Sequence, residues 1–420
     1  MGWVLLLVPL MAQAATAPPA AAPPARVQAS VTQVVARAPQ VGQEARQPDS
    51  PSSAPPVAEA QPKPAPLVMP TLAAPRQAAA AAAPQDTPGM APGESSGFPT
   101  MQFRGFSDVS YHVDDLDGHA NSFALGQFNL FITSKLSDKL SVLAEAVIEA
   151  DQFNTVGIDL ERLLFRWASS DYLSVSLGRY HTAIGWYNTA YHHSSWMQTA
   201  IGRPFLFEFE DDGGILPIHN VGVSISGQIP AGGLGLRYIV EVGNGRASRA
   251  KSDEPVQNVV DENRGKAVNL AILSRPAGLP GFQAGLSVYY DTLTPDGMPK
   301  VGQTIVAGHA VYQTQEVEWL NEMVLIRNAT QGSGHVASTT GFYTQVSKKF
   351  GAWRPYARYQ SVSAPDDDPV FPEVGQQHGP SVGLRYDAGE FVALKFQYER
   401  TERRGLSGYN VVATQLSFTF

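Results

Sequence analysis

The sequence has no cysteine among its 420 residues, which excludes both a disulfide framework and a thiolate metal site. Its formal net charge of −8 does not suggest nucleic-acid binding, which requires a clustered basic face. No glycine-rich phosphate loop and no nucleophile-elbow pattern occurs. The apolar run at Trp3 to Met11 is too short to cross a bilayer as a helix. Nucleic acid is therefore not an expected partner, and no sequence motif points to an enzyme.

The composition is uneven along the chain. Of the 32 prolines, 17 lie between Ala15 and Phe98, and the first tyrosine is Tyr111. All tryptophans except Trp3 follow residue 98. The chain therefore divides into an apolar leader, a low-complexity stretch and an aromatic-rich body.

Residues 1–14 have the pattern of a secretory signal peptide. The apolar run is followed by Ala12-Gln13-Ala14, a small-x-small cleavage pattern, so we expect cleavage after Ala14. No Lys or Arg precedes the run, which departs from the usual pattern. The alternative is an apolar N-terminus buried in the folded protein. The cleavage pattern favours export.

Residues 15–98 are rich in Ala, Pro, Gln and Ser. Such a segment buries too little apolar surface to offset the entropy of ordering, so we expect a disordered or polyproline-like periplasmic linker. A segment of this kind could serve as a tether toward the cell wall, although no residue in it identifies a target.

The body, residues 99–420, has a dominant period of two. Leu236, Tyr238, Val240 and Val242 fall on one side of a run whose other side carries Arg237 and Glu241. Residues 381–387 and 390–399 repeat this alternation. Strict alternation indicates strands with one apolar and one polar face, so the fold class is all-β.

About sixteen such segments can be counted, each close to the ten residues that a tilted membrane strand needs. Tight turns alternate with longer polar loops, the longest of which covers residues 183–217. A soluble all-β protein is the alternative, but its strands are typically shorter and its core does not accept unpaired charges. Aromatic residues also recur near the strand ends, as they do at membrane interfaces. The sequence therefore predicts a transmembrane antiparallel β-barrel of about 16 strands, with both termini on the periplasmic side.

The final segment, Gln415-Leu416-Ser417-Phe418-Thr419-Phe420, ends on an aromatic residue with apolar residues at alternate positions. It resembles the C-terminal signal by which the barrel-assembly machinery recognises outer-membrane proteins. With the sixteen strands and one outsized third loop, residues 100–420 resemble bacterial porins of the general or phosphate-selective kind. The resemblance implies the outer membrane of a Gram-negative-type bacterium, contact with its lipid, and a possible homotrimer. It also implies that the third outward loop, residues 183–217, folds into the barrel and narrows the pore.

Two sets of residues are candidates for this constriction. The loop contributes Trp186, Tyr191, Arg203, Glu208, Glu210 and Asp211. By strand parity, the wall contributes Arg162, Arg166, Arg237, Arg358 and Arg385. Opposed acidic and basic rows would create a transverse field across the pore. The alternative is that the arginines pair with wall carboxylates such as Glu145, Glu241, Glu318 and Glu322.

Other functions of the loop are possible. Its aromatic residues could stack against sugars, but packing of the loop against the wall is the commoner role. His192 and His193 are adjacent and point to opposite faces of an extended chain, which is poor geometry for a metal. A hydrolase built on His193 and Ser194 lacks a residue to orient the base. We therefore expect a passive channel for small hydrophilic solutes or ions, with no metal and no cofactor. A structural barrel tethered through residues 15–98 is the main rival.

Overall fold

The computed structural model describes residues 99–116, 119, 121–150, 155–191, 195–210, 213–248, 259–295 and 297–420. The predicted signal peptide, the predicted linker and Asp211 lie outside this part of the chain. Within the described residues, no helix is long and apolar enough to cross a membrane.

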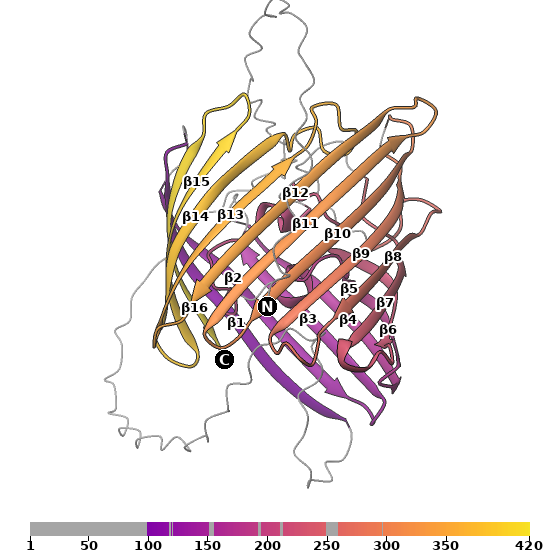
Figure 1. Ribbon diagram of the computed structural model, residues 1–420, viewed down its shortest axis with the longest axis horizontal. Helices are drawn as coiled ribbons and strands as arrows, with labels where there is room; N and C mark the ends of the chain where they lie inside the picture. The colour runs from indigo at the N-terminus through magenta and orange to yellow at the C-terminus, as the bar shows by residue number, and fades with distance from the viewer. Residues whose placement is uncertain are drawn as a thin grey trace, which may run out of the picture. The chain divides into compact units, whose positions relative to one another are not determined.

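The described chain forms one closed barrel of sixteen antiparallel strands (Figure 1). Each strand pairs with its neighbours in sequence, and β1 closes the barrel against β16, with Phe106 opposite Thr419. The strands are β1 (Thr100–Asp114), β2 (Ser122–Lys135), β3 (Leu140–Ala150), β4 (Val156–Ser170), β5 (Leu173–His181), β6 (His219–Gln228), β7 (Leu236–Gly243), β8 (Ala267–Ser274), β9 (Phe282–Leu293), β10 (Val301–Gln313), β11 (Val317–Thr330), β12 (Val336–Lys348), β13 (Trp353–Ser363), β14 (Gln376–Asp387), β15 (Val392–Arg403) and β16 (Tyr409–Thr419). The predicted fold class and strand number are confirmed.

The connections differ at the two rims of the barrel. Tight turns such as 136–139, 171–172 and 388–391 join strands at one rim, which we call the turn rim. The start of β1 and the end of β16 lie at this rim as well. The connections at the other rim include 182–218, the longest, and 364–375. The even strand number places both ends of the barrel on one side, as expected.

Alternate residues of each strand face the interior and the exterior. In β16, Ser417 is fully buried, whereas Leu416 is exposed on the outside, as is Phe420 just beyond the strand. Large apolar side chains such as Phe103, Phe165 and Met323 are exposed on the outer surface, where a water-soluble protein would carry polar residues.

In the described strands, the alternation of inward and outward residues is interrupted, because the register shifts at three places. The shifts lie between Ser107 and Val109, between Glu145 and Ala146, and between Ala168 and Ser170. A bulge inserts one residue into one strand and reverses which face the following residues occupy. These bulges were not predicted from the sequence, and all three lie in the first five strands.

Candidate functional site: the interior and its long loop

The long loop at residues 182–218 contacts residues of strands from β7 to β15, and it also reaches β1, where Ser195 Oγ donates to Asp108 Oδ1 at 3.0 Å. It contains the short helix α1 (Tyr187–Ala190) and the 3-10 turn η1 (Phe205–Phe207). A second 3-10 turn, η2 (Gly232–Leu234), lies in the turn between β6 and β7. None of these helical turns was predicted, since each has only three or four residues. Helical periodicity can be recognised only over a longer segment.

The start of α1 is held by a carboxylate from the barrel wall. Glu322 accepts hydrogen bonds from the backbone N–H groups of Trp186, at 2.5 Å, and Tyr187, at 2.9 Å. It also accepts one from the hydroxyl of Tyr343 on β12, at 2.7 Å. The first N–H groups of a helix have no partner within the helix, and a carboxylate satisfies them. Glu322 thereby fixes the helix against β11 and β12.

Two further wall carboxylates bind the loop in the same manner. Glu241 on β7 accepts from the backbone N–H of Ala183 at 3.0 Å. Glu318 on β11 accepts from the hydroxyls of Tyr191, at 3.0 Å, and Thr199, at 3.2 Å. These carboxylates of β7 and β11 therefore accept hydrogen bonds from donors of the long loop.

Apolar packing joins the loop to strands β8–β13, which we call the packed wall. Phe207 is fully buried and stacks on Tyr187, with ring centroids 5.3 Å apart. Both rings meet Tyr343 edge-on, with centroids 6.1 Å apart in each case. The cluster also includes Trp186 and Tyr191 of the loop. Its inward-facing members on the packed wall are Ala267, Tyr289, Leu293, Val301, Ile305, Ala307, Val311, Leu320, Val324, Ile326, Tyr343 and Val362.

This cluster differs from the expected polar inner face. An apolar inner surface becomes stable where another part of the chain covers it and excludes water. Burial also raises the pKa of Tyr187 to about 12, which keeps its hydroxyl protonated as a donor to Gln198. The aromatic residues of the loop therefore pack it against the wall.

A row of three cations holds the next part of the loop. Lys395 donates to the carbonyls of Ser195 and Ala200, and Arg385 donates to those of Trp196 and Gln198. Arg358 donates to the carbonyls of Ile201 and Gly202, at 2.9 to 3.3 Å. We call Arg358, Arg385 and Lys395 the cationic anchor, because six loop carbonyls accept hydrogen bonds from them.

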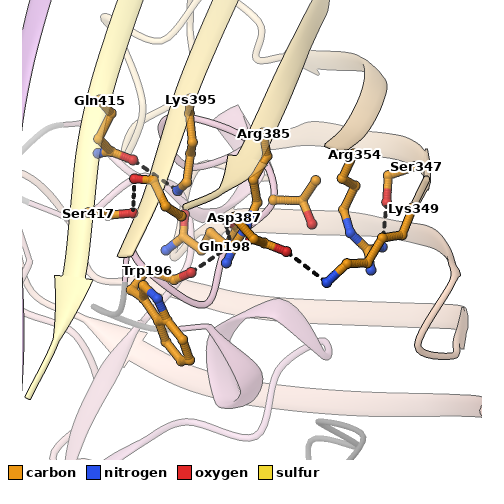
Figure 2. A network of polar contacts seen from close by, with 12 residues as sticks. Trp196, Gln198, Ser347, Lys349, Arg354, Arg385, Asp387, Lys395, Gln415 and Ser417 are labelled. Carbon is orange, nitrogen blue, oxygen red and sulfur yellow. Dashed lines mark hydrogen bonds and ion pairs between the residues drawn. The ribbon is translucent and has the colours of Figure 1, made fainter. Parts of the chain in front are cut away.

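Figure 2 shows Lys395 beside Gln415, and Arg385 between the loop residues Trp196 and Gln198 and the carboxylate of Asp387. Arg385 lies directly opposite Lys395 in the sheet. Like charges in this position repel each other, so the loop carbonyls and Asp387 are needed to stabilise the row. The distance from Arg385 Nε to Asp387 Oδ1 is 2.7 Å.

Two other loops cover the end of the packed wall. Arg246, from the loop between β7 and β8, donates to the carbonyls of Ile215 and Gly214 and stacks over Phe371. Asp368, beside Phe371 in the loop between β13 and β14, accepts from Asn328 and Thr339 of the wall. Arg246 therefore joins the long loop to the loop between β13 and β14.

The predicted wall arginines all lie on the inner face but have different partners. Arg162 pairs with Glu145 on β3, with 2.5 Å between Nε and Oε2, as the alternative of wall pairing predicted. Arg166 and Arg237 donate to Ser174 and Ser226. Arg358 and Arg385 donate to backbone carbonyls of the long loop.

The predicted loop residues separate into two groups. Trp186 and Tyr191 belong to the apolar cluster. Arg203 stacks over Tyr187 and Phe209, while Glu210 accepts from the backbone N–H of Ile218 and lies 4.0 Å from His219. Glu208 lies just beyond η1, and its carbonyl oxygen is close to Gly214. Glu210 therefore contacts the end of the long loop and the first residue of β6.

Lys395 was not among the residues predicted for the site, and Glu322 was expected only as a partner for the wall arginines rather than for the loop backbone. The alternation of inward and outward residues predicts that both side chains face the interior, but it does not predict what they bind. The loop atoms that they bind are backbone groups, which no residue pattern specifies.

Strands β1–β7, which we call the open wall, line a cavity of about 490 Å³. Residues of the turns after β2 and β4 contribute to its lining, so it lies at the turn rim; we call it the rim cavity. Every lining residue falls between Thr100 and Arg237, and two of them are the predicted Arg166 and Arg237. The packed wall contributes nothing to this lining.

The described residues contain no group of three His, Asp or Glu side chains that could hold a metal ion. His181 lies against His219, with ring centroids 5.5 Å apart, and His219 Nε2 is 2.5 Å from Glu161. His192, His193 and Ser194 lie outside the described residues.

No protein-family model and no curated protein matches the sequence. Solved structures of similar fold include an anion-selective porin from Comamonas acidovorans, with 13% identity and a TM-score of 0.56 over 77% of this chain and 100% of that one. The outer membrane channel DcaP of Acinetobacter baumannii matches with 9% identity and a TM-score of 0.53 over 79% and 100%. OmpT of Vibrio cholerae matches with 10% identity and a TM-score of 0.52 over 78% and 99%.

Proposed function

We propose that the protein is a passive outer-membrane channel for small hydrophilic solutes or ions. The premise is the fold, because the described residues between 100 and 420 form the sixteen-stranded barrel of the bacterial outer-membrane porins to which the structure is similar. The observation that supports the proposal most strongly is the unequal filling of the interior. One wall is covered by the loop, whereas the other lines a polar cavity.

In this proposal the loop at residues 183–217 is the constriction. It narrows the lumen by occupying the side of the packed wall, so solutes pass along the open wall. Arg162 and its partner Glu145 would then face the passage, together with Arg166 and Arg237. The predicted loop residues Trp186, Tyr191 and Arg203, with Glu208 and Glu210, would shape the constriction by packing and anchoring.

The topology also supports an orientation. Tight turns face the periplasm in outer-membrane barrels and longer loops face outward. The turn rim and both ends of the barrel would accordingly be periplasmic, which would place residues 15–98 there as well. A homotrimer is a further part of the proposal, since one of the similar OmpT structures is described as a trimer form.

Conductance of the purified full chain in a planar bilayer tests the proposal. We expect discrete, ohmic channel openings that persist when residues 15–98 are deleted. A folded barrel that inserts and never conducts would contradict the channel. In that event the tethering function, which rests on the proline-rich composition of residues 15–98, would be the better account.

A further inference from the structure

The rim cavity has a charge opposite in sign to that of the whole chain. Its lining includes four cations, Lys135, Lys139, Arg166 and Arg237. It includes two carboxylates, Asp138 and Asp171, so four positive and two negative charges leave a net of +2. The complete sequence carries −8. A concave surface lined mainly by one sign of charge concentrates ions of the other sign.

Hydroxyl groups surround these cations. The lining contains the hydroxyl residues Thr100, Thr133, Ser137, Ser141, Ser170, Ser174 and Ser226. Arg166 Nε donates to Ser174 Oγ at 2.8 Å, and Arg237 donates to Ser226 Oγ at 3.3 Å. A hydroxyl that accepts a hydrogen bond from a guanidinium directs its own hydrogen elsewhere. Each arginine–serine pair therefore presents both guanidinium N–H and hydroxyl O–H donors. Guanidinium, ammonium and hydroxyl donors together are the groups that recognise oxyanions.

Within the rim cavity, Lys135 Nζ lies 3.5 Å from Asp138 Oδ1. Four other cations of the inner face are bound by protein groups away from this cavity. Those of the cationic anchor bind the loop, and Lys395 is only 1% exposed. Arg162 is held by Glu145. The rim cavity is therefore where several basic side chains meet a space large enough for a small solute.

We propose that the rim cavity is a binding site for small oxyanions, that is, solutes carrying a phosphate, sulfate or carboxylate group. This inference rests on the proposed channel function, because the site would give the pore an anion preference. The oxyanion would be held between Arg166 and Arg237, with the neighbouring hydroxyls as further donors.

Two measurements test the site, and only one of them depends on conduction. The first is the reversal potential of the full chain in a potassium chloride gradient, with and without inorganic phosphate. We expect an anion preference and a saturable block of chloride current by phosphate. The variant Arg166→Gln/Arg237→Gln should reduce the chloride-to-potassium permeability ratio by about threefold, and Arg166→Glu/Arg237→Glu should invert the preference.

The control is Arg327→Gln, on the outer face of β11, where the loss of one positive charge away from the cavity should leave the ratio unchanged. Cation preference in the natural chain, or a ratio that does not respond to Arg166→Gln/Arg237→Gln, would overturn the proposal.

The second measurement is binding of inorganic phosphate to the detergent-solubilised barrel, followed by phosphorus NMR line broadening. We expect broadening that Arg166→Gln/Arg237→Gln removes and Arg327→Gln retains. A barrel that conducts without binding phosphate would refute the site and leave the channel intact. A barrel that binds phosphate without conducting would refute the channel and leave the site intact.

Discussion

The packed wall and the open wall belong to one barrel but carry different residues on their inner faces. Strands β8–β13 turn apolar residues such as Ile305 and Leu320 inward, and the long loop covers them. Strands β1–β7 turn hydroxyl and basic residues inward around the rim cavity. An inner face of a barrel can therefore be either a packing surface or a solvated surface, and the loop determines which.

Charges follow the same division. On the covered side, Glu322 and the cationic anchor bind backbone N–H groups and carbonyls of the loop. On the open side, Arg166 and Arg237 contact serine hydroxyls next to the cavity. Arginine therefore binds the long loop from β13 and β14, and lines the rim cavity from β4 and β7.

The largest effect on the loop is expected from Phe207→Ala. Removing this fully buried ring leaves a cavity between Tyr187 and Tyr343, which costs about 3–5 kcal/mol. Amide hydrogen exchange in residues 183–191 and 199–210 should accelerate accordingly. The control Phe165→Ala, on the exposed outer face of β4, should leave exchange in these residues as it was. Equal exchange in both variants would mean that the loop does not depend on this core.

Glu322→Ala should have the next largest effect. It leaves the buried N–H groups of Trp186 and Tyr187 without their acceptor, at a cost of about 2–3 kcal/mol. Protease cleavage within residues 183–191 should increase. Glu322→Gln keeps one carbonyl oxygen and should recover part of the protection. If the glutamine and alanine variants were equally sensitive, helix anchoring by this carboxylate would be refuted.

Arg358→Met should loosen residues 201–205 with a smaller effect, about 1–2 kcal/mol. The substitution keeps an apolar side chain of similar length but removes the donors to Ile201 and Gly202. Larger open-channel current noise is the expected readout, because the constriction moves more. Arg327→Met on the outer face supplies the control, and an equal rise in noise there would contradict the anchoring role.

Ser141→Trp on the open wall should have the smallest effect on stability, within about 0.5 kcal/mol. The indole projects into the rim cavity, so we expect a clear fall in single-channel conductance without a change in hydrogen exchange of the loop. Ser361→Trp, on the outer face of β13, serves as the comparison. Unaltered conductance for Ser141→Trp would show that solutes do not pass along this wall.

Much of the barrel can be predicted from the sequence, because strand alternation and turn lengths are local properties. The closing strand and the inward position of Arg237 and Arg385 follow from a period of two. The bulge at Glu145 and Ala146 does not, since one inserted residue leaves only a short break in the pattern.

The division of the interior could not be predicted. The inward residues of β10 include Val301, Ile305 and Val311, but the outward ones include Val306 and Tyr312, so both faces look moderately apolar. Only the three-dimensional position of the loop shows which face is covered. The anchors escaped prediction for a related reason, because Lys395 recognises carbonyl groups that every residue possesses.

Cysteine accessibility tests the central claim most directly, since the natural chain contains no cysteine. A single cysteine would be introduced as Ser226→Cys on the open wall or as Ala307→Cys on the packed wall. A charged, water-soluble methanethiosulfonate would then be added during conductance recording. The account predicts rapid reaction and a stepwise fall in current for Ser226→Cys, and protection for Ala307→Cys, which lies at a position 2% exposed. Fast block through Ala307→Cys with no response from Ser226→Cys would contradict it.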